Sequence, residues 1–257
     1  MTSKLATLPE GDLIETWDEY YRQADGDTAL KDRNFFRLEV EAIRDALMRH
    51  ASHRCLNIVE LGAGTGFLAE FLIDALNLER QADHKYVGVD FSKEAVTKAR
   101  ARNLANAIFV EEDFQAFLDS DQPPIDVLIS QRSIMAVIDP AKQRELLKAI
   151  KRRLAPDGIA ILSEGTRQGA DTVNALRRRT GQADFDHVWH CLYVDIDSVS
   201  ELFQSVSVED FASMYWIVTR VIYPFGREPE HNTLVHDLAA QLPQVGDYGL
   251  VKLIVAQ

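Results

Sequence analysis

Three glycines occupy alternate positions in the segment VELGAGTGFLAEF, which begins at Val59. They are Gly62, Gly64 and Gly66, and they directly follow the short apolar run LNIVEL. Glycine has no Cβ atom, so it adopts positive φ angles readily and lets a ligand approach the main chain. The segment therefore predicts a buried strand, a bare turn and a helix, with a ligand at the turn. Two kinds of ligand compete for that place: the linked phosphates of a dinucleotide, and a nucleoside that carries a sulfonium group.

The spacing of the glycines favours the second kind of ligand. A dinucleotide-binding turn follows the pattern G-x-G-x-x-G/A, in which the third small residue lets the helix approach the strand. Read from Gly62, that third position holds the bulky Phe67. The pattern present is instead E-x-G-x-G-x-G, which begins at Glu60. A pyrophosphate at the start of the following helix is therefore disfavoured.

Acidic residues stand at the ends of the next two predicted strands. Asp90 ends the strand in VGVDFS, and Asp113 follows the strand in AIFVEEDF. A carboxylate can accept two hydrogen bonds from the hydroxyl pair of a ribose, which gives Asp90 a chemical reason to be acidic. Asp113 can equally be the polar end of its strand. Glu60 is expected either to hold the glycine turn through its N–H groups or to face an ammonium group of the ligand.

Residues 56–164 resemble the class I S-adenosylmethionine-dependent methyltransferases. Glu60 and the three glycines match motif I of that family, and LAPDGIAILSEG matches its fifth strand and the turn before it. The resemblance implies that Asp90 binds the ribose hydroxyls of S-adenosylmethionine and that Asp113 and Phe114 contact its adenine. It assigns these further residues to the cofactor: Gly62, Ala63, Gly64, Gly66, Phe91 and Ser130.

The elements that must position these residues alternate along the chain. Apolar runs and amphipathic stretches follow one another over residues 56–165, which favours a parallel sheet with helices on both faces and ligands beyond the carboxyl ends of the strands. Ser92 and Asp139 are expected to cap the helices that follow them, because their side-chain oxygens accept from free backbone N–H groups. Five strands are expected, at LNIVEL, KYVGVD, AIFVEEDF, IDVLISQRS and IAILSEG, the last after a turn at Pro156, Asp157 and Gly158.

The C-terminal part departs from this alternation. DIDSVSELF, from Asp195, predicts a helix, VSVEDFASMYWIVTRVIYP a long extended run, and GLVKLIVAQ a terminal strand. No crossover helix fits close to that last strand, so the final strand pair is expected to be antiparallel. With the resemblance, this predicts an α/β, Rossmann-like class I methyltransferase fold: a mostly parallel seven-stranded sheet with an antiparallel C-terminal strand and an N-terminal helical cover.

The 257 residues are expected to form a single methyltransferase domain, because no Gly-, Ser- or Pro-rich linker divides them. The two helices of the N-terminal cover are predicted at LIETWDEYYRQ, from Leu13, and NFFRLEVEAIRDALMRH, from Asn34. The domain is expected to have four parts: a helical cover at 1–54, a cofactor-binding core at 55–165, an acceptor-binding insert at 166–194, and a C-terminal helix and strand pair at 195–257.

Composition excludes several partners. The formal net charge is -12, so the field of the protein repels polyanions and no nucleic acid is expected as a partner. No apolar run approaches the length that spans a bilayer, so no membrane association is expected and a cytoplasmic location is predicted. Cys55 and Cys191 are expected to be reduced, since two cysteines without a CxxC arrangement suggest neither a disulfide framework nor a zinc knuckle.

Methyl transfer from a sulfonium is an in-line displacement, so much of the acceleration can come from positioning the nucleophile. An acceptor hydroxyl must also lose its proton, and histidine suits that task near neutral pH. The insert at 166–194 contains HVWHCLY, in which His190 is the candidate base. We expect the insert to form the acceptor pocket, because it is longer than a plain connection and follows the carboxyl end of a strand. The residues expected to contact the acceptor are Glu164, Trp189 and Tyr193.

No metal site is expected. His187, His190 and Cys191 lie close together in the sequence but lack an obvious fourth ligand. The metal-dependent catechol-type methyltransferases place an acidic ligand just after the fourth strand, where this chain has SQRS, from Ser130. The DPPY or NPPY signature of enzymes that methylate amino groups of nucleic acids is also missing there.

The N-terminal helices and the segment between them supply further candidates. Trp17, Tyr20 and Tyr21 can close over the cofactor, because aromatic faces attract a sulfonium as they attract other cations. They can equally form the apolar face of a helix that packs on the core. Arg33 can pair with the methionine carboxylate of the cofactor through a bidentate fork.

The sequence thus favours an enzyme that transfers a methyl group from S-adenosylmethionine to an oxygen or nitrogen of a small-molecule acceptor. One alternative is an NAD-dependent dehydrogenase, which Phe67 and the antiparallel end of the sheet disfavour. Another is a non-catalytic S-adenosylmethionine-binding regulator or partner subunit, which keeps the fold without an acceptor site. The identity of the acceptor and the oligomeric state stay open at this point.

Overall fold

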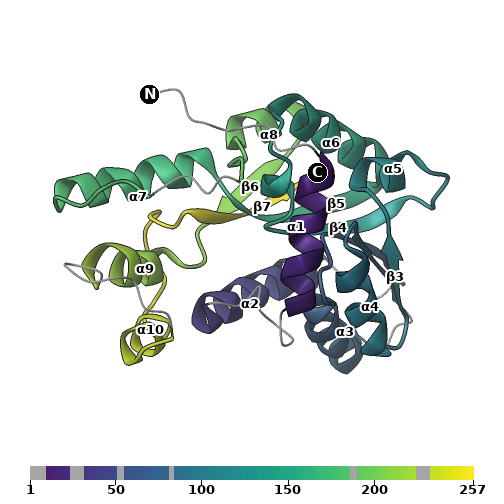
Figure 1. Ribbon diagram of the computed structural model, residues 1–257, viewed down its shortest axis with the longest axis horizontal. Coiled ribbons are helices and arrows are strands. Elements are labelled where there is room, and N and C mark those ends of the chain that lie inside the picture. The colour runs from purple at the N-terminus through teal and green to yellow at the C-terminus, as the bar shows by residue number, and fades with distance from the viewer. Residues whose placement is uncertain (1–9, 24–31, 51–54, 81–83, 186–189, 224–231) are drawn as a thin grey trace.

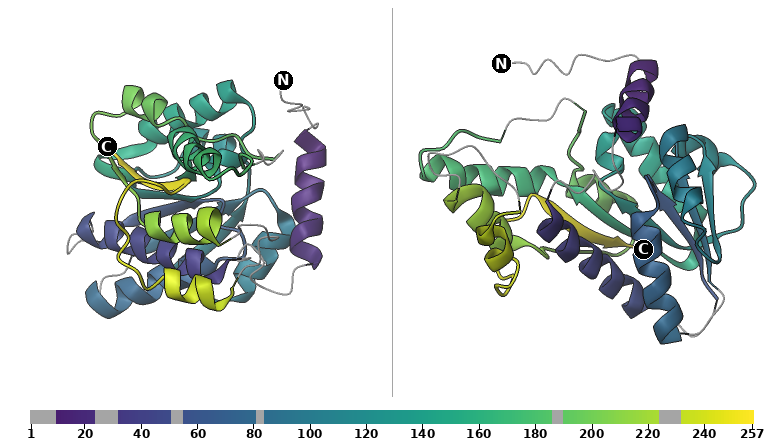
Figure 2. Two further views of the ribbon diagram at one scale, coloured as in Figure 1. Left: turned by 90° about the vertical axis from the view of Figure 1, so that its left-hand side faces the viewer. Right: turned by 60° about the horizontal axis from the view of Figure 1, so that its bottom comes forward.

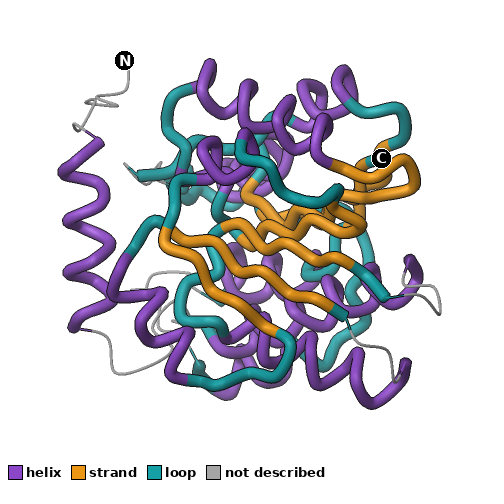
Figure 3. The backbone as a smooth tube through the Cα atoms, turned by 90° about the vertical axis from the view of Figure 1, so that its right-hand side faces the viewer, coloured by secondary structure: helices purple, strands orange, loops and turns teal. Residues whose placement is uncertain are grey.

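A seven-stranded sheet runs through the centre of the molecule, and helices cover both of its faces (Figure 1 and Figure 3). The computed structural model describes residues 10–23, 32–50, 55–80, 84–185, 190–223 and 232–257. The strand order is β3-β2-β1-β4-β5-β7-β6, with β7 antiparallel to both of its neighbours, which confirms the predicted fold class. The strands are β1 (Asn57–Leu61), β2 (Lys85–Asp90), β3 (Ala107–Glu111), β4 (Ile125–Gln131), β5 (Leu154–Gly165), β6 (Val206–Glu209) and β7 (Val251–Ala256).

The strand order reverses at β1, which pairs in parallel with both β2 and β4. In open sheets of this kind, the crevice at such a switch point, beyond the carboxyl ends of the strands, is where ligands bind. The glycine turn directly follows β1, so the topology places it at the predicted ligand-binding edge.

Helices pack on the two faces of the sheet through separate apolar cores. One core contains the buried face of α2, in which Phe36, Val40, Ile43 and Leu47 recur at helical spacing, together with side chains of α3 and α4. The other contains side chains of α5, α6 and α8. The helices are α1 (Glu10–Gln23), α2 (Arg33–His50), α3 (Phe67–Arg80), α4 (Lys93–Ala101), α5 (Phe114–Asp119), the 3₁₀ helix η2 (Ile134–Ala136), α6 (Pro140–Arg153), α7 (Arg167–Arg179), α8 (Ile196–Leu202), α9 (Ser213–Trp216), the π-helix η3 (Ile217–Ile222) and α10 (Leu234–Ala239).

Local side-chain caps begin several of these helices. Ser92 accepts from the N–H of Ala95 at the start of α4, and Asp139 accepts from the first N–H groups of α6, so both predicted caps are confirmed. Asp113 also acts as a cap, since its Oδ1 accepts from the N–H of Ala116 at 3.0 Å and begins α5. The sequence predicts a polar strand end at this position and no helix.

The predicted turn before the fifth strand is instead a bulge within it. Ile125 of β4 pairs with Leu154 and Val127 pairs with Ile159, so four residues of β5 loop out between two successive contacts. A Cβ atom at Gly158 would lie 2.6 Å from the carbonyl oxygen of Ile125, which explains why a residue without a side chain stands there. The chain therefore stays in the sheet where the sequence predicts a break.

The long extended run predicted after residue 205 is wrong beyond its first residues. Only β6 is extended, and the chain then forms α9 and the π-helix η3. The rings of Tyr215 and Trp216 pack against Phe35 of α2, so burial against another element overrides the β preference of aromatic residues. Two side chains satisfy carbonyl groups of the π-helix η3. Arg177 of α7 donates to the carbonyl of Arg220, and Gln182, just after α7, donates to the carbonyl of Val221.

Helix α1 stands apart from the two helical layers and is drawn as a separate column in the left panel of Figure 2. It is attached to the start and the outer face of α4. The hydroxyl of Ser92 donates to Oδ1 of Asp18 at 2.5 Å, and Nζ of Lys98 donates to the carbonyl of Tyr21 at 2.6 Å. These contacts hold α1 against the carboxyl ends of β1 and β2.

Candidate functional site

The glycine turn has left-handed backbone at all three glycines, with φ of +77° at Gly62, +50° at Gly64 and +77° at Gly66. The N–H groups of Gly62 and Ala63 both donate to the carbonyl of Val89, at 2.8 and 3.1 Å, which ties the turn to the end of β2. A Cβ atom at Gly62 would lie 1.9 Å from Oγ of Ser133, so the loop after β4 fills the space that a side chain would need. The bare backbone is thus required by both its conformation and its packing.

Asp90 lies directly across from this turn. Its Oδ2 accepts from the N–H of Gly64 at 2.9 Å, and its Oδ1 accepts from the N–H of Ser92 at 2.9 Å. The side chain is almost completely buried, and burial raises the pKa of Asp90 to about 6, against the effect of the two backbone donors. The carboxylate therefore joins the ends of β1 and β2 and titrates closer to neutrality than an exposed aspartate.

Two aromatic rings lie beside the turn. Phe91, after β2, and Phe114, at the start of α5, have ring centroids 6.5 Å apart. The Phe114 ring also reaches the turn, since its Cζ lies 3.5 Å from the position of a Cβ atom on Gly62. Asp113 points its carboxylate to its own helix as a cap. The structure thus brings Gly62, Phe91 and Phe114 together.

Glu60 is fully buried in β1, where it accepts a hydrogen bond from the hydroxyl of Tyr86 at 2.8 Å. The structure thus pairs Glu60 with a side chain of β2, and not with the N–H groups of the glycine turn. Burial raises the pKa of Glu60 to about 8, and the hydrogen bond from Tyr86 opposes this shift. Tyr86 has no part in the sequence analysis, although the register that sets Glu60 near it follows from two short parallel strands.

Glu164 organises the loop that follows β4. Its Oε1 accepts from the hydroxyl of Ser130 at 2.6 Å and from the N–H groups of Ser133 and Ile134, while its Oε2 accepts from the N–H of Met135 at 3.1 Å. Burial raises the pKa of Glu164 to about 7, and these donors lower it. Ser130 and Glu164, assigned by sequence to cofactor and acceptor respectively, are therefore hydrogen-bonded to each other.

Helix α1 brings its aromatic residues over the glycine turn. The hydroxyl oxygen of Tyr21 lies 3.1 Å from the position of a Cβ atom on Gly64. Burial raises the pKa of Tyr21, and the negative charge of nearby Asp90 adds to that effect. The ring of Trp17 meets the ring of His190 edge-on, with centroids 5.6 Å apart. Trp17 and Tyr21 therefore connect the glycine turn with the candidate base.

The end of the insert packs on the loop after β4. The N–H of Leu192 donates to the carbonyl of Met135 at 2.6 Å, and a Cβ atom on Gly165 would lie 3.1 Å from the ring of Tyr193. His190 is partly buried, and burial raises the pKa of Cys191 to about 11. His187 and Trp189 lie outside the described residues.

The structure changes which arginine is a candidate for the site. Arg33 stands exposed at the start of α2, where its N–H donates to Asn232 at 2.8 Å. Arg132, which the sequence analysis passes over within SQRS, lies at the end of β4 next to Ser133 and is paired with Glu39 of α2. Its position directly after a strand of the ligand-binding edge is the signal that could have identified it.

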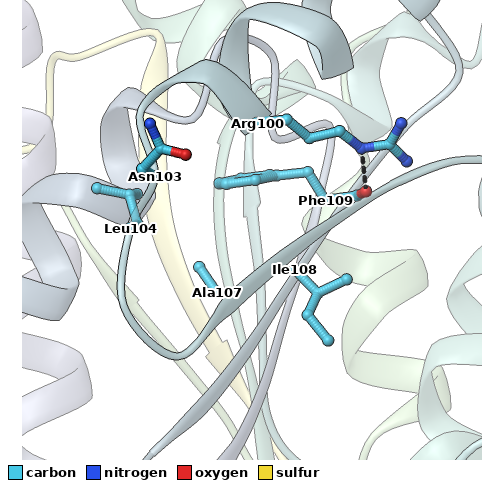
Figure 4. Close-up of a pocket in the computed structure, with 6 residues that line it drawn as sticks. All are labelled: Arg100, Asn103, Leu104, Ala107, Ile108 and Phe109. Atoms are coloured by element: carbon cyan, nitrogen blue, oxygen red, sulfur yellow. Dashed lines mark hydrogen bonds between the residues drawn. The ribbon is translucent and has the colours of Figure 1, made fainter.

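Other features lie away from this edge. Figure 4 shows a hollow beside the amino end of β3, in which Nε of Arg100 donates to the carbonyl of Phe109 at 3.0 Å. Its lining residues are Arg100, Asn103, Leu104, Ala107, Ile108 and Phe109. Within the described ranges, no three His, Cys, Asp or Glu side chains group as a metal site would require, and no helix is long and apolar enough to cross a membrane. The metal-independent reaction and the cytoplasmic location stay predictions.

Comparisons with known proteins agree with the geometry of the glycine turn. A family model described as a methyltransferase domain matches residues 58–158. A carboxy-S-adenosyl-L-methionine synthase from Desulfotalea psychrophila is 24% identical over 205 residues, which cover 78% of this chain and 74% of that protein.

Solved structures share the fold over almost the whole chain. An N-methyltransferase from Bradyrhizobium japonicum, in complex with S-adenosyl-L-homocysteine, matches with a TM-score of 0.56 and 13% identity over 95% of this chain and 96% of its own. A chain from a Haloferax volcanii complex of the Trm112 methyltransferase activator with a methyltransferase matches with a TM-score of 0.60 and 18% identity, over 93% and 96%. With the strand order and the glycine turn, the matched model identifies residues 58–158 as a methyltransferase domain within a class I S-adenosylmethionine-dependent methyltransferase fold.

Proposed function

We propose that the protein transfers a methyl group from S-adenosylmethionine to an oxygen or nitrogen of a small-molecule acceptor, without a metal ion. The observation that carries this proposal is the contact between the left-handed glycine turn and Asp90, in which Gly64 N–H donates to the carboxylate at 2.9 Å. That contact places bare backbone and a carboxylate at the switch point of the sheet, where a nucleoside with an amino-acid tail can meet both.

The residues at this edge fit the cofactor. Each oxygen of a carboxylate has two acceptor sites, so Asp90 can bind a ribose diol while it keeps its bonds to Gly64 and Ser92. Phe91 and Phe114 offer ring faces to the adenine. The further cofactor contacts in this proposal are the turn itself (Gly62, Ala63, Gly64, Gly66), Glu60, Asp113 and Ser130.

Helix α1 is the cover of the cofactor site in this proposal. Tyr21 lies over Gly64, and Trp17 lies between Tyr21 and His190. When bound, S-adenosylmethionine supplies a methyl group on a positively charged sulfur, and the faces of Trp17 and Tyr21 stabilise that charge. The guanidinium of Arg33 lies at the exposed start of α2, so a role for it at the methionine carboxylate has less support than the roles of Trp17 and Tyr21.

The insert at 166–194 forms the acceptor pocket in this proposal, between the cofactor-binding core at 55–165 and the C-terminal part at 195–257. His190 accepts the proton of the attacking oxygen or nitrogen on a ring nitrogen. Tyr193 and Trp189 contact the acceptor in this proposal. Through its four hydrogen bonds, Glu164 holds the loop after β4, against which the residues next to Tyr193 pack.

Calorimetry tests the cofactor, and a mass-shift screen tests the reaction. We expect S-adenosylhomocysteine to bind the protein with one site per chain and NADH not to bind. Binding of NADH without binding of S-adenosylhomocysteine contradicts the proposal in favour of a dehydrogenase. Binding of S-adenosylhomocysteine with no gain of a methyl group by any acceptor in a broad library favours the non-catalytic regulator.

A further inference from the structure

Arg132 adopts an unusual backbone conformation at the carboxyl end of β4. Its φ is +56°, in the left-handed region that residues with a Cβ atom rarely enter. Its N–H donates to the carbonyl of Ser163 at 2.7 Å, which fixes the conformation against β5. Residues in such conformations occur preferentially at ligand-binding and active sites, where the surrounding structure compensates for the strain.

The side chain of Arg132 is held in place from α2. Its Nε lies 3.2 Å from Oε2 of Glu39, and its Cζ lies 5.9 Å from the centroid of the Phe35 ring. Glu39 is fully buried and accepts two further hydrogen bonds at 2.7 Å, from the side chains of Gln131 and Ser163. The guanidinium therefore lies between the Glu39 carboxylate and the Phe35 ring.

The terminal amino groups, Nη1 and Nη2, form the outer edge of the same guanidinium. Within the part of the chain that the structure describes, the shortest distance of the ion pair with Glu39 is from Nε, and none of the three guanidinium nitrogens of Arg132 makes a hydrogen bond. The side chain is 31% exposed. If Arg132 served only to neutralise Glu39, its two terminal amino groups would be expected to contact the carboxylate as well, since arginine and carboxylate prefer the paired arrangement.

Arg132 also lies at the ligand-binding edge of the sheet, directly after β4. Burial raises the pKa of Tyr21 on α1 and of Cys191 at the end of the insert, and the positive charge of Arg132 opposes both shifts. The next residue, Ser133, fills the space next to Gly62. Asp90 is on β2, the glycine turn follows β1, and Arg132 follows β4, so Arg132 lies past the turn on the side opposite to Asp90.

We propose that Arg132 binds a carboxylate of the methyl acceptor, and that the acceptor of this enzyme is therefore an organic acid. The inference rests on the proposed function and adds the substrate class. A bidentate fork matches the geometry of a carboxylate. A doubly charged phosphate is less suitable, because Glu39 already neutralises the guanidinium and the buried acids Glu60, Asp90 and Glu164 stand near the same edge.

The test uses two variants and matched pairs of acceptors. Arg132→Gln removes the positive charge, and the double variant Glu39→Gln with Arg132→Gln removes both charges, so that no buried carboxylate is left without a counterion. Arg152→Gln is the control, because Arg152 is an exposed arginine paired with Asp119 at 3.3 Å on the surface. The probes are hydroxybenzoates, aminobenzoates, α-hydroxy acids and amino acids, each beside its primary amide.

Two readouts are taken with every variant. Calorimetry measures binding of each probe to the protein saturated with S-adenosylhomocysteine, and mass spectrometry measures transfer of a methyl group from S-adenosylmethionine. We expect acids to bind and react in preference to their amides. Both Arg132 variants should weaken binding of the acids on the order of 10- to 100-fold, the range for a hydrogen bond to a charged group, while the control and the affinity for S-adenosylhomocysteine are unchanged.

Three results overturn the inference. Amides bind as well as acids, or no acid binds the wild-type complex, or the variants weaken S-adenosylhomocysteine but not 5′-methylthioadenosine. The last result places Arg132 on the amino-acid carboxylate of the cofactor, because methylthioadenosine lacks that tail. Failure of the wild-type protein to bind S-adenosylhomocysteine is a separate outcome, which refutes the proposed function and the inference with it.

Discussion

The N–H of Gly64 donates to Oδ2 of Asp90 at 2.9 Å and so joins the ends of two neighbouring strands. Both strands end at the switch point of the sheet, and the bond orients the carboxylate before any ligand is present. A binding group that is already oriented loses less entropy when the ligand arrives. In our account this contact prepares the ribose site of a methyltransferase.

Tyr21→Ala should weaken binding of S-adenosylmethionine more than binding of S-adenosylhomocysteine. The ring lies over Gly64, and only S-adenosylmethionine carries a positive sulfur. The loss of affinity for S-adenosylmethionine should therefore be about three- to ten-fold greater than the loss for S-adenosylhomocysteine. Calorimetric titration of both ligands measures this difference, with Glu15→Ala, at an exposed residue of the same helix, as a control. Equal losses for the two ligands would show that Tyr21 contributes packing alone.

Gly62→Ala should destabilise the protein by about 2–4 kcal/mol, because the new methyl group needs a positive φ and would overlap Ser133. The double variant Gly62→Ala with Ser133→Gly removes the overlap and keeps the backbone strain, so it should recover part of the loss. Urea unfolding measures both free energies. A single variant as stable as the wild type, or a double variant with no recovery, contradicts the packing described for the turn.

Stability should fall as pH rises from about 5 to 8. Burial raises the pKa of Asp90 to about 6, of Glu164 to about 7 and of Glu60 to about 8, all above the values of the unfolded chain. The folded state therefore binds more protons than the unfolded state in this range, and losing them costs folding free energy. The stability that these groups contribute in their protonated form is present at low pH and is lost as pH passes each folded pKa.

Glu60→Gln isolates one of these groups. The amide keeps the shape and an acceptor for the hydroxyl of Tyr86 without a titrating proton. The variant should match the wild type at pH 5 and exceed its free energy of unfolding at pH 8 by on the order of 1–3 kcal/mol. Urea titrations of the ligand-free protein at both pH values provide the test, and a variant that is less stable than the wild type at pH 8 would contradict the assignment.

His190→Gln should lower kcat for an oxygen acceptor by about 10²- to 10⁴-fold and leave the affinity for S-adenosylhomocysteine unchanged. The ring meets the ring of Trp17 edge-on near the end of the insert. Steady-state kinetics and calorimetry measure the two quantities separately. A kcat close to that of the wild type would leave His190 as a structural residue of the insert.

Local signals explain what the sequence could predict. Ser92 and Asp139 are confirmed as caps because each bonds to N–H groups within three residues of itself. The glycine turn and the strands around it follow from short apolar runs, and the antiparallel last strand follows from the lack of a crossover. Asp113 belongs to the same class of local cap, but a reading as a strand end hides the short helix that it begins.

Long-range contacts explain what the sequence could not predict. Arg132 and Glu39 come from different elements, and their pairing depends on how α2 packs across the sheet. The sequence pattern predicts only that Tyr21 lies in an amphipathic helix. The attachment of α1 to α4 is what places its ring over Gly64. The helices after β6 replace a predicted extended run because Tyr215 and Trp216 find partners on α2, which no local pattern records.

The most direct test of the account is the affinity of Asp90→Ala for S-adenosylhomocysteine, measured by calorimetry beside the wild type. The truncation removes both carboxylate oxygens that are oriented by Gly64 and Ser92. If this edge of the sheet holds the nucleoside, the wild type binds and the variant loses most of its affinity, on the order of 100-fold or more for paired charged hydrogen bonds. If a folded variant binds as tightly as the wild type, the nucleoside does not lie where we place it.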